Sequence, residues 1–431
     1  MDSTNRVTRN GVTAFLECMK CKETTHIQQM VSACLQCNGP LQYVFVGEYQ
    51  GQTLDRTDLW KNFDLIPLVD QANIVSLNVG DSAIIELEEL SDILRGAKLF
   101  IKLDSQKNPT GTFKDREASI IMSRCKELGL DHLVFYSTGN AGRAYTHYAA
   151  HLGLTTYFFM PRECQYKNTA SITKNKNNFI ILIDAHYPEI GPYVKKFAVE
   201  NNLHAIAPLH DRIECYATVA YEQFQQMPNC DFFVQTIASG LGAIGFVRGH
   251  NNLIKFGLEQ EADRPRVICV QSRETNSMYR AYTSGKTKMS SDDLPSEFPP
   301  NLFEPTLNST NSVNNYPDLY KCLQDSNGII TDADPKDVIK DSDRLIEALE
   351  KRNIVLQLDL EKSVFIGFSG LVKLAEEGAI GKNDRLLLLV TGRGNDRARS
   401  LIPPDIAINP AIDDPKDVKQ RLDKSSHGTI L

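Results

Sequence analysis

The strongest constraint on the fold is a series of short, nearly uninterrupted apolar runs that alternate with helix-like stretches. The runs are rich in β-branched and aromatic residues and lie at residues 99–103, 133–136, 155–160, 179–183, 232–237, 267–270 and 386–390. The helix-like stretches between them lie at residues 113–128, 141–152, 193–200, 217–226 and 337–351. Strands that are apolar on both sides and alternate with helices are typical of parallel sheets covered on both faces. The sequence therefore predicts an α/β protein.

Composition and charge narrow the class of partner. The 431-residue chain has 42% hydrophobic and 23% charged residues, an ordinary globular composition that is sufficient for more than one core. Its net charge is −7 and it has no basic block, so we expect no nucleic-acid partner. No apolar stretch approaches the roughly 20 residues that span a bilayer, and residues 1–12 lack the apolar core of a signal peptide. We expect no membrane association and a cytoplasmic location.

Four of the ten cysteines form two Cys-x-x-Cys pairs near the N-terminus: Cys18 with Cys21, and Cys34 with Cys37. Each pair can form a tight turn whose two thiolates point the same way, and two such turns can close a tetrahedral site that Zn²⁺ accepts. A segment this small buries too little apolar surface to fold alone, so a metal would supply the missing stability. The spacing predicts a structural zinc site, with iron in its place as a variant. The alternatives are four reduced cysteines in loops, or a redox pair.

Three loops that follow apolar runs and open helices have unusual composition. The first, NPTGTFKDR at residues 108–116, places Lys114 at a helix start, where the helix dipole disfavours a cation. A lysine whose pKa is lowered in this way is a usable nucleophilic amine, whereas the alternative is a solvated surface lysine. The others are STGNAGR at 137–143 and SGLGAIG at 239–245, whose small residues leave backbone N–H groups free for a carboxylate or phosphate. The glycine-rich loop alone is equally consistent with a simple turn.

In this order, the three motifs resemble the pyridoxal-phosphate enzymes of fold type II, whose fold is tryptophan synthase β-like, and most closely the branch of threonine synthase and cysteate synthase. The resemblance covers most of residues 60–400 and implies two parallel-sheet domains and a homodimer. Some relatives also carry an N-terminal zinc-ribbon-like segment, in agreement with the four cysteines. The expected division is a ribbon at 1–50, a large domain at 51–125 and 229–403, a small domain at 126–228, and a polar, fraying tail at 404–431.

The resemblance also assigns a role to each motif residue. Lys114 would form the Schiff base with pyridoxal phosphate, Asn140 would bond the ring hydroxyl, and Thr391, in the TGRGNDR turn, would meet the ring nitrogen. A neutral hydroxyl there favours elimination and replacement over transamination. The cofactor phosphate would be held by Ser239, Gly240 and Gly242, and the substrate carboxylate by Ser137, Thr138 and Gly139.

Positive side chains near the motifs are candidates for binding a substrate phosphate or sulfite. Arg143 is the first candidate because its guanidinium fork suits a tetrahedral oxyanion, and the alternative is a charge on the helix surface. Lys102 and Arg116 are weaker candidates. His147 and His151 have metal-like spacing but no third ligand nearby, which favours packing. Residues 284–318 are read as a long loop, either a surface excursion or an active-site cover.

Departures from the usual motifs favour one member of the branch. Glu117 stands where a glycine is usual, Ala238 and Leu241 stand in the phosphate loop, and the last motif reads TGRGNDR. These differences favour β-replacement on O-phospho-L-serine, with sulfite giving L-cysteate and phosphate. The alternatives are a threonine synthase acting on O-phosphohomoserine, a synthase that uses an amine to make 2,3-diaminopropionate, and a non-catalytic binding protein with the same fold.

Overall fold

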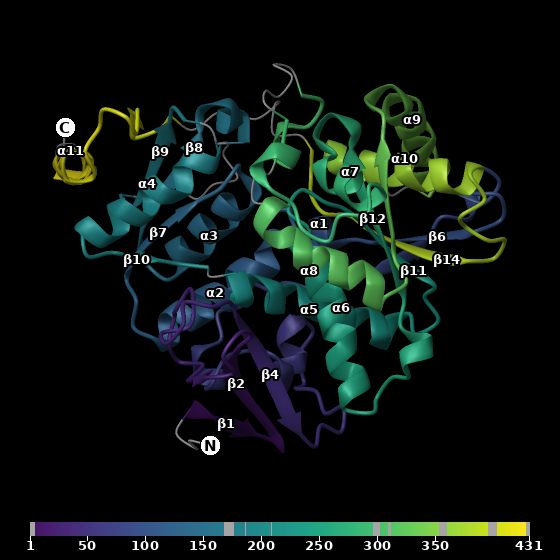
Figure 1. The fold of residues 1–431 in the computed structure, drawn as a ribbon, viewed down its shortest axis with the longest axis horizontal. Helices are drawn as coiled ribbons and strands as arrows, with labels where there is room; N and C mark the ends of the chain where they lie inside the picture. Colours follow the sequence, from purple (N-terminus) through teal and green to yellow (C-terminus); the bar gives the residue numbers. More distant parts are fainter. Residues whose placement is uncertain are drawn as a thin grey trace.

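Three β-sheets organise the chain, with helices packed between and around them (Figure 1). The structure is a computed structural model that describes residues 5–167, 176–185, 187–207, 209–295, 302–308, 312–352, 360–394 and 403–427. The last three residues of the predicted TGRGNDR turn, 395–397, lie outside the described residues. No helix among the described residues is both long and apolar enough to span a membrane.

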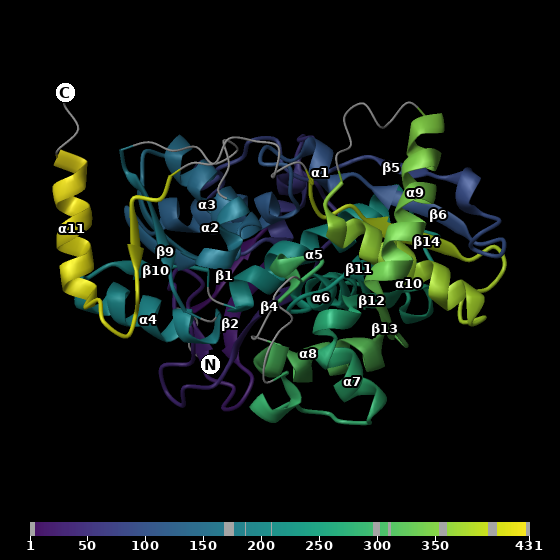
Figure 2. The same ribbon diagram turned by 90° about the horizontal axis from the view of Figure 1, so that it is seen from above.

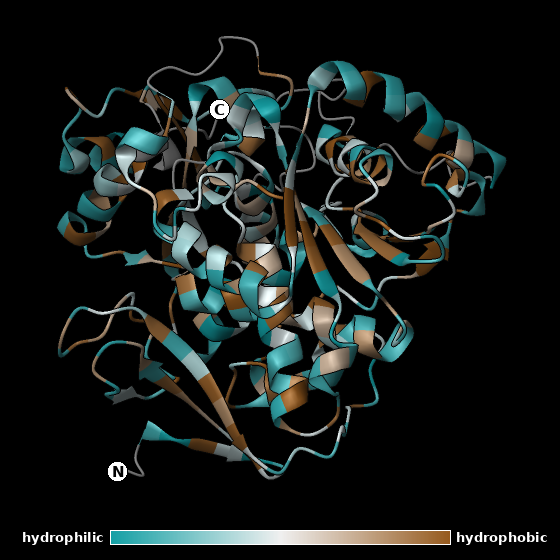
Figure 3. Ribbon diagram, turned by 45° about the vertical axis from the view of Figure 1, so that its right-hand side comes forward, coloured by the Kyte–Doolittle hydropathy of each residue, from teal (hydrophilic) through white to brown (hydrophobic). Residues whose placement is uncertain are grey.

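The largest sheet has six strands in the order β13-β12-β11-β14-β6-β5. Only β5 runs antiparallel to its neighbour, and the other pairs are parallel. The strands are β5 (Ile84–Glu86), β6 (Lys98–Lys102), β11 (Phe232–Thr236), β12 (Arg266–Ser272), β13 (Ile329–Ala333) and β14 (Arg385–Leu389). Side chains on both faces are buried, and the central strands are mostly hydrophobic (Figure 3). This confirms the predicted parallel α/β sheet.

A second, five-stranded sheet is parallel throughout, in the order β10-β7-β8-β9-β15. Its strands are β7 (His132–Tyr136), β8 (Thr155–Pro161), β9 (Asn178–Ile183), β10 (His204–Ala205) and β15 (Ile406–Ile408). The prediction that the tail after Pro403 frays is wrong for β15, which pairs with β9, and for α11 (Pro415–His427), which packs against α4 (Tyr187–Glu200). This polar segment is ordered because its few apolar residues, Ile408, Val418 and Leu422, are buried in the core of the five-stranded sheet. The domain boundaries themselves stay a prediction.

Helices cover both parallel sheets and fill the space between them (Figures 1 and 2). The central ones are α2 (Lys114–Glu127), α5 (Leu209–Gln226) and α6 (Leu241–Lys255). The remaining ones are α1 (Asp104–Lys107), α3 (Asn140–His151), α7 (Ser277–Thr283), α8 (Ser312–Asp325), α9 (Pro335–Lys351) and α10 (Lys362–Glu376). Strand β13 and helix α10 are absent from the sequence-based prediction, and α8 begins inside the segment 284–318 that was predicted to be a loop.

A buried ionic network ties α2 to α5 and the first strands of the large sheet. Arg116 lies 2.6 Å from both Asp104 and Glu222, and Lys102 lies 2.8 Å from Glu222, all four side chains being fully buried. Removing one partner from such a network would leave an uncompensated buried charge. Lys102 and Arg116 are therefore structural, and neither serves as a phosphate ligand.

The N-terminal segment forms a separate four-stranded antiparallel sheet from β1 (Val7–Arg9), β2 (Val12–Cys18), β3 (Thr24–Thr25) and β4 (Leu41–Gly47). It packs against α5 and α6 (Figure 1). Arg248 of α6 joins the two parts, because its guanidinium contacts both Glu214 of α5 and the Tyr43 carbonyl of β4. The segment is thus docked on the helices that reach the cavity described next.

Candidate active site

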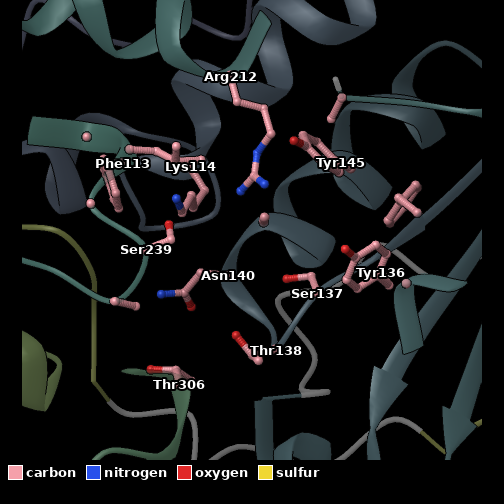
Figure 4. A pocket seen from close by; sticks show the side chains of 18 of the residues that line it. Phe113, Lys114, Tyr136, Ser137, Thr138, Asn140, Tyr145, Arg212, Ser239 and Thr306 are labelled. Atoms are coloured by element: carbon pink, nitrogen blue, oxygen red, sulfur yellow. The ribbon is translucent and has the colours of Figure 1, made fainter. Parts of the chain in front are cut away.

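A cavity of about 780 Å³ lies where strands of both parallel sheets end. Its wall includes the residues that follow β7, β11 and β14, the strand ends at which ligands collect in open α/β sheets. The volume suits a cofactor together with a small substrate. Among the residues predicted for the site, the cavity brings together Lys114, Ser137, Thr138, Asn140, Ser239, Gly240, Gly242 and Thr391 (Figure 4).

Lys114 is the first residue of α2 and points into the cavity (Figure 4). The turn before it is fixed by the Thr112 hydroxyl, which accepts a hydrogen bond from the Lys114 N–H at 2.8 Å. The ammonium donates to the Tyr216 hydroxyl at 2.5 Å and lies 3.7 Å from the Glu117 carboxylate. Burial lowers the pKa of Lys114 to about 8, against the opposing charge of Glu117. A substantial fraction of this amine is therefore neutral near physiological pH.

Glu117, which the sequence analysis noted only as a departure, is the centre of a buried polar cluster. Its carboxylate accepts a hydrogen bond from Arg212 Nε at 2.7 Å and further bonds from the Tyr145 and Tyr216 hydroxyls. Burial alone would raise the pKa of Glu117, but the charges of Arg212 and Lys114 and the two hydroxyl donors lower it to about 2. Glu117 is thus ionised, and Tyr216 bridges it to the Lys114 amine.

This cluster predicts how Lys114 titrates. In cofactor-free protein, an amine-reactive reagent should modify Lys114 with a midpoint near pH 8, because only the neutral amine reacts. Glu117→Gln removes a charge that stabilises the ammonium form, so the midpoint should move to lower pH. The control is Glu163→Gln, an exposed acid elsewhere on the chain. The rate of modification of Lys114 is measured by peptide mass spectrometry as a function of pH. A wild-type midpoint near 10.5 would contradict the assignment.

The cavity wall holds a second buried carboxylate, Glu361. It accepts hydrogen bonds from Asn140 Nδ2 at 2.9 Å, from the Thr391 hydroxyl at 2.9 Å and from the Ser363 hydroxyl at 2.7 Å. The backbone fixes it there, because its N–H donates to the Gly392 carbonyl and a Cβ on Gly392 would lie 2.4 Å from its carboxyl carbon. The predicted neutral hydroxyl, Thr391, is therefore in direct contact with a carboxylate that the sequence analysis missed. Its only sequence signal is an acidic residue just before a helix.

The glycine-rich loop at the start of α6 has the geometry of an anion cradle. Gly240 has a φ of +79° and caps the helix, a conformation that favours glycine. A Cβ on Gly242 would lie 2.3 Å from Gln235 Nε2, so the loop backbone packs too closely against the Gln235 side chain for any residue other than glycine. Gln235 Oε1 is buried in the cavity wall without a hydrogen-bond partner among the described residues. Free N–H groups at the helix start can bind a phosphate.

The loop from Ser137 to Asn140 presents a second helix start to the cavity. The Ser137 hydroxyl accepts a hydrogen bond from the Gly139 N–H at 3.0 Å, and Gly139 has a φ of +145° that only glycine adopts without strain. Ser137, Thr138 and Asn140 line the cavity, whereas Gly139 lies behind them against the Lys167 side chain. The first N–H groups of α3 have no partner within the helix and can receive a carboxylate.

Arg143 does not line the cavity, contrary to the role that the sequence analysis gave it. It is buried, with Nη2 3.3 Å from Asn140 Oδ1. The arginine that points into the cavity is Arg212, whose side chain is 27% exposed and lies between Lys114 and Tyr145 (Figure 4). The sequence carried little signal for it, because it lies in no motif and follows a segment without a recognisable strand. Thr306, Leu307 and Asn308 also line the cavity, so part of the 284–318 segment covers it.

The four N-terminal cysteines converge as their spacing predicts. Neighbouring sulfur atoms lie 3.4–3.6 Å apart, and all four lie within 4.8 Å of one another. Four ligands at about 2.3 Å from a tetrahedral Zn²⁺ are about 3.8 Å apart, so the cluster fits a metal with little change. Within the described ranges, no other group of three or more metal-binding side chains converges, and His147 and His151 are not part of one.

The cavity fits pyridoxal phosphate in the roles that the sequence suggests. Lys114 offers a partly neutral amine, the Gly240–Gly242 cradle offers a site for the phosphate, and the partnerless Gln235 oxygen marks polar space beside it. Asn140 and Thr391 line the same cavity. We propose these residues as the cofactor ligands, with Ser137, Thr138 and the α3 start as the site of the substrate carboxylate.

Comparisons with known proteins identify the family and the fold. The chain is 23% identical over 403 residues to the threonine synthase of Methanocaldococcus jannaschii, which covers 91% of this chain and 93% of that relative. It is also 23% identical over 394 residues to the cysteate synthase of Methanococcoides burtonii, covering 85% and 87%. Diaminopropionate ammonia lyase from Escherichia coli has the same fold, with a TM-score of 0.59 at 14% identity over 75% of this chain and 87% of that one. Residues 75–392 match the family described as pyridoxal-phosphate dependent enzymes, and the chain belongs to that family.

Proposed function

We propose that this enzyme replaces the phosphate of O-phospho-L-serine with sulfite, giving L-cysteate and phosphate. The C–O bond at the β-carbon breaks and phosphate leaves with the electron pair, while the sulfur lone pair of sulfite forms the new C–S bond. The observation that carries the proposal is Arg212, a guanidinium held over the cavity beside Lys114. A planar, permanently charged fork of this kind suits a tetrahedral oxyanion.

The position of Arg212 is set by its partner, which distinguishes it from a surface arginine. Glu117 holds Nε at 2.7 Å, and Nη1 and Nη2 are placed farther along the side chain, toward the cavity. Arg212 stays charged throughout the physiological pH range, whereas Lys114 titrates near pH 8, so Arg212 is the constant positive charge in this part of the cavity wall. A doubly negative phosphate is favoured there.

The chemistry can be divided between the cofactor and the chain. When bound, pyridoxal phosphate supplies the electron sink that stabilises negative charge at the substrate α-carbon. The Lys114 amine takes the α-proton as general base, since its pKa of about 8 leaves part of it neutral near pH 7. Tyr216 accepts a hydrogen bond from this amine and donates another to Glu117, so it orients the amine. Arg212 binds the phosphate as it departs and the sulfite that follows.

Relatives named cysteate synthase support the choice of reaction, among them that of Methanocorpusculum labreanum, 24% identical over 304 residues. A second candidate is threonine synthesis from O-phosphohomoserine. It is supported by the relatives named threonine synthase, one of which matches 91% of this chain. Both candidates need the same lysine, cradle and oxyanion-binding arginine, and they differ in the length of the substrate side chain and in the nucleophile.

A substrate panel separates the candidates. Purified, cofactor-loaded protein is incubated with O-phospho-L-serine or O-phospho-L-homoserine, each with sulfite, ammonia or water alone, and the products are identified by mass. We expect L-cysteate and one equivalent of phosphate only from O-phospho-L-serine with sulfite. Formation of threonine from O-phospho-L-homoserine and water would overturn the proposal in favour of the second candidate. Formation of 2,3-diaminopropionate from O-phospho-L-serine and ammonia would show that an amine, and not sulfite, is the nucleophile. Lys114→Ala is the control for non-enzymatic breakdown.

A further inference from the structure

The loop between the two cysteine pairs reaches the active-site cavity. Met30 and Ser32 belong to the same cavity wall as Lys114 and Arg212, although they lie in the N-terminal segment. Met30 is half-buried and packs against the core that α2 and α3 share with the five-stranded sheet, as do Ile206 and Ala207 of the same wall. The segment that carries the cysteines therefore supplies part of the substrate-binding surface as well as a docked sheet.

The loop is held on one side at Gln29, whose carbonyl accepts a hydrogen bond from Arg124 Nη2 of α2 at 3.5 Å, and on the other side by the cysteine cluster. Ser32 lies two residues before Cys34, and the structure shows no hydrogen bond that joins residues 30–33 to another described residue. Regular backbone bonds resume only at Cys34, whose N–H donates to the Gly39 carbonyl at 2.9 Å. Because Cys34 Sγ lies 3.6 Å from Cys21 Sγ, a metal bound by the cluster would join both ends of the loop.

The same segment also supports Arg212. The Tyr43 hydroxyl of β4 donates to Asp211 Oδ1 at 2.6 Å, and Arg124 Nε of α2 donates to Asp211 Oδ2 at 2.9 Å, with all three side chains buried. Asp211 directly precedes Arg212 at the start of α5. Displacement of the N-terminal sheet would therefore disturb both Met30 and Arg212, which line the same cavity.

We propose that metal binding by Cys18, Cys21, Cys34 and Cys37 positions Met30 and Ser32 as a wall of the substrate cavity, so that the metal controls substrate binding. Met30 and Ser32 are then specificity-determining residues in the wall of the cavity. The inference rests on the proposed function only for the identity of the substrate. Binding of inorganic phosphate, the proposed leaving group, tests it separately.

The test uses cofactor-loaded full-length protein and starts with variants that keep the metal. Met30→Ala should retain one zinc per chain and full cofactor absorbance, and should raise KM for O-phospho-L-serine and Kd for inorganic phosphate by about tenfold, with kcat changed less. Leu35→Ala is the matched control, since Leu35 lies between Cys34 and Cys37, is 73% exposed and does not line the cavity. Unchanged KM and Kd in Met30→Ala would overturn the proposal.

Removal of the metal completes the test. Cys18→Ser/Cys21→Ser, or chelation of the wild-type protein, should raise the same KM and Kd at unchanged cofactor absorbance, and added zinc should restore the chelated protein. If chelation lowers cofactor content and thermal stability together while KM of the remaining enzyme stays unchanged, the metal is only structural and the proposal fails. If O-phospho-L-serine is not a substrate, the phosphate Kd still decides between these outcomes, and only the proposed function falls.

Discussion

Lys114→Ala should lower turnover of the phosphoester by at least about 10³-fold, because one amine both holds the cofactor and moves the α-proton. The buried amine has a pKa of about 8 and sits against Tyr216 and Glu117, an environment that no surface lysine shares. Lys195 also lines the cavity and is the matched control. Lys195→Ala should keep most of the activity.

Two measurements check this result. Phosphate release gives the rate, and mass spectrometry of protein reduced with borohydride locates the covalently attached cofactor on a peptide. We expect the cofactor mass on the peptide that contains residue 114 in the wild type and in Lys195→Ala, and on no peptide in Lys114→Ala. Attachment at residue 195, or full turnover without the Lys114 amine, would refute the assignment.

Arg212→Ala should raise KM for O-phospho-L-serine by about 10²-fold, the loss expected for a charge-assisted pair with a phosphate. The single change also removes one of the two cations beside the buried Glu117, which keeps Lys114 and two tyrosine hydroxyls as partners, so we expect some loss of stability as well. Arg212→Ala/Glu117→Gln removes this second effect, and the KM increase should persist in the double variant.

Steady-state kinetics and thermal unfolding separate binding from stability in these variants. Arg143→Ala is the informative comparison, because the sequence pointed to Arg143 and the structure points to Arg212. Arg143 is buried and does not line the cavity, although it contacts Asn140, so its loss should lower the unfolding temperature and leave KM nearly unchanged in the folded, cofactor-loaded fraction. A large KM effect in Arg143→Ala, with none in Arg212→Ala, would favour the sequence-based choice.

The contrast between these two arginines shows what the sequence can predict here. Lys114, Asn140 and Ser239 each sit in a local motif after a strand, and parallel topology brings the carboxyl ends of such strands together. Arg212 and Glu361 reach the same cavity from positions outside the motifs that the sequence analysis recognised, and their place depends on how α5 and α10 pack. Packing of that kind leaves no short-range pattern in a single sequence.

The predictions of oxyanion ligands from positively charged side chains were the least reliable part of the sequence evidence. Lys102, Arg116 and Arg143 were all candidate oxyanion ligands, because each carries a positive charge and lies in or near a motif. All three are buried, and none of them lines the cavity. For Lys102 and Arg116 the partners are Asp104 and Glu222, the second of which lies more than a hundred residues away along the chain. The sign of a side chain is visible in a sequence, whereas the distance to its counterion is not.

The pairing of β15 with β9 has a consequence for any shortened form of this chain. With residues 406–408 in place, β9 has a neighbour on each side. A stop codon, fusion junction or protease cut near residue 403 would leave β9 as an exposed edge strand, with unpaired N–H and C=O groups along an apolar segment. Exposed strands of this kind recruit other chains and lead to aggregation. Expression boundaries drawn by family homology, which ends at residue 392, would therefore produce insoluble protein for a reason unrelated to catalysis.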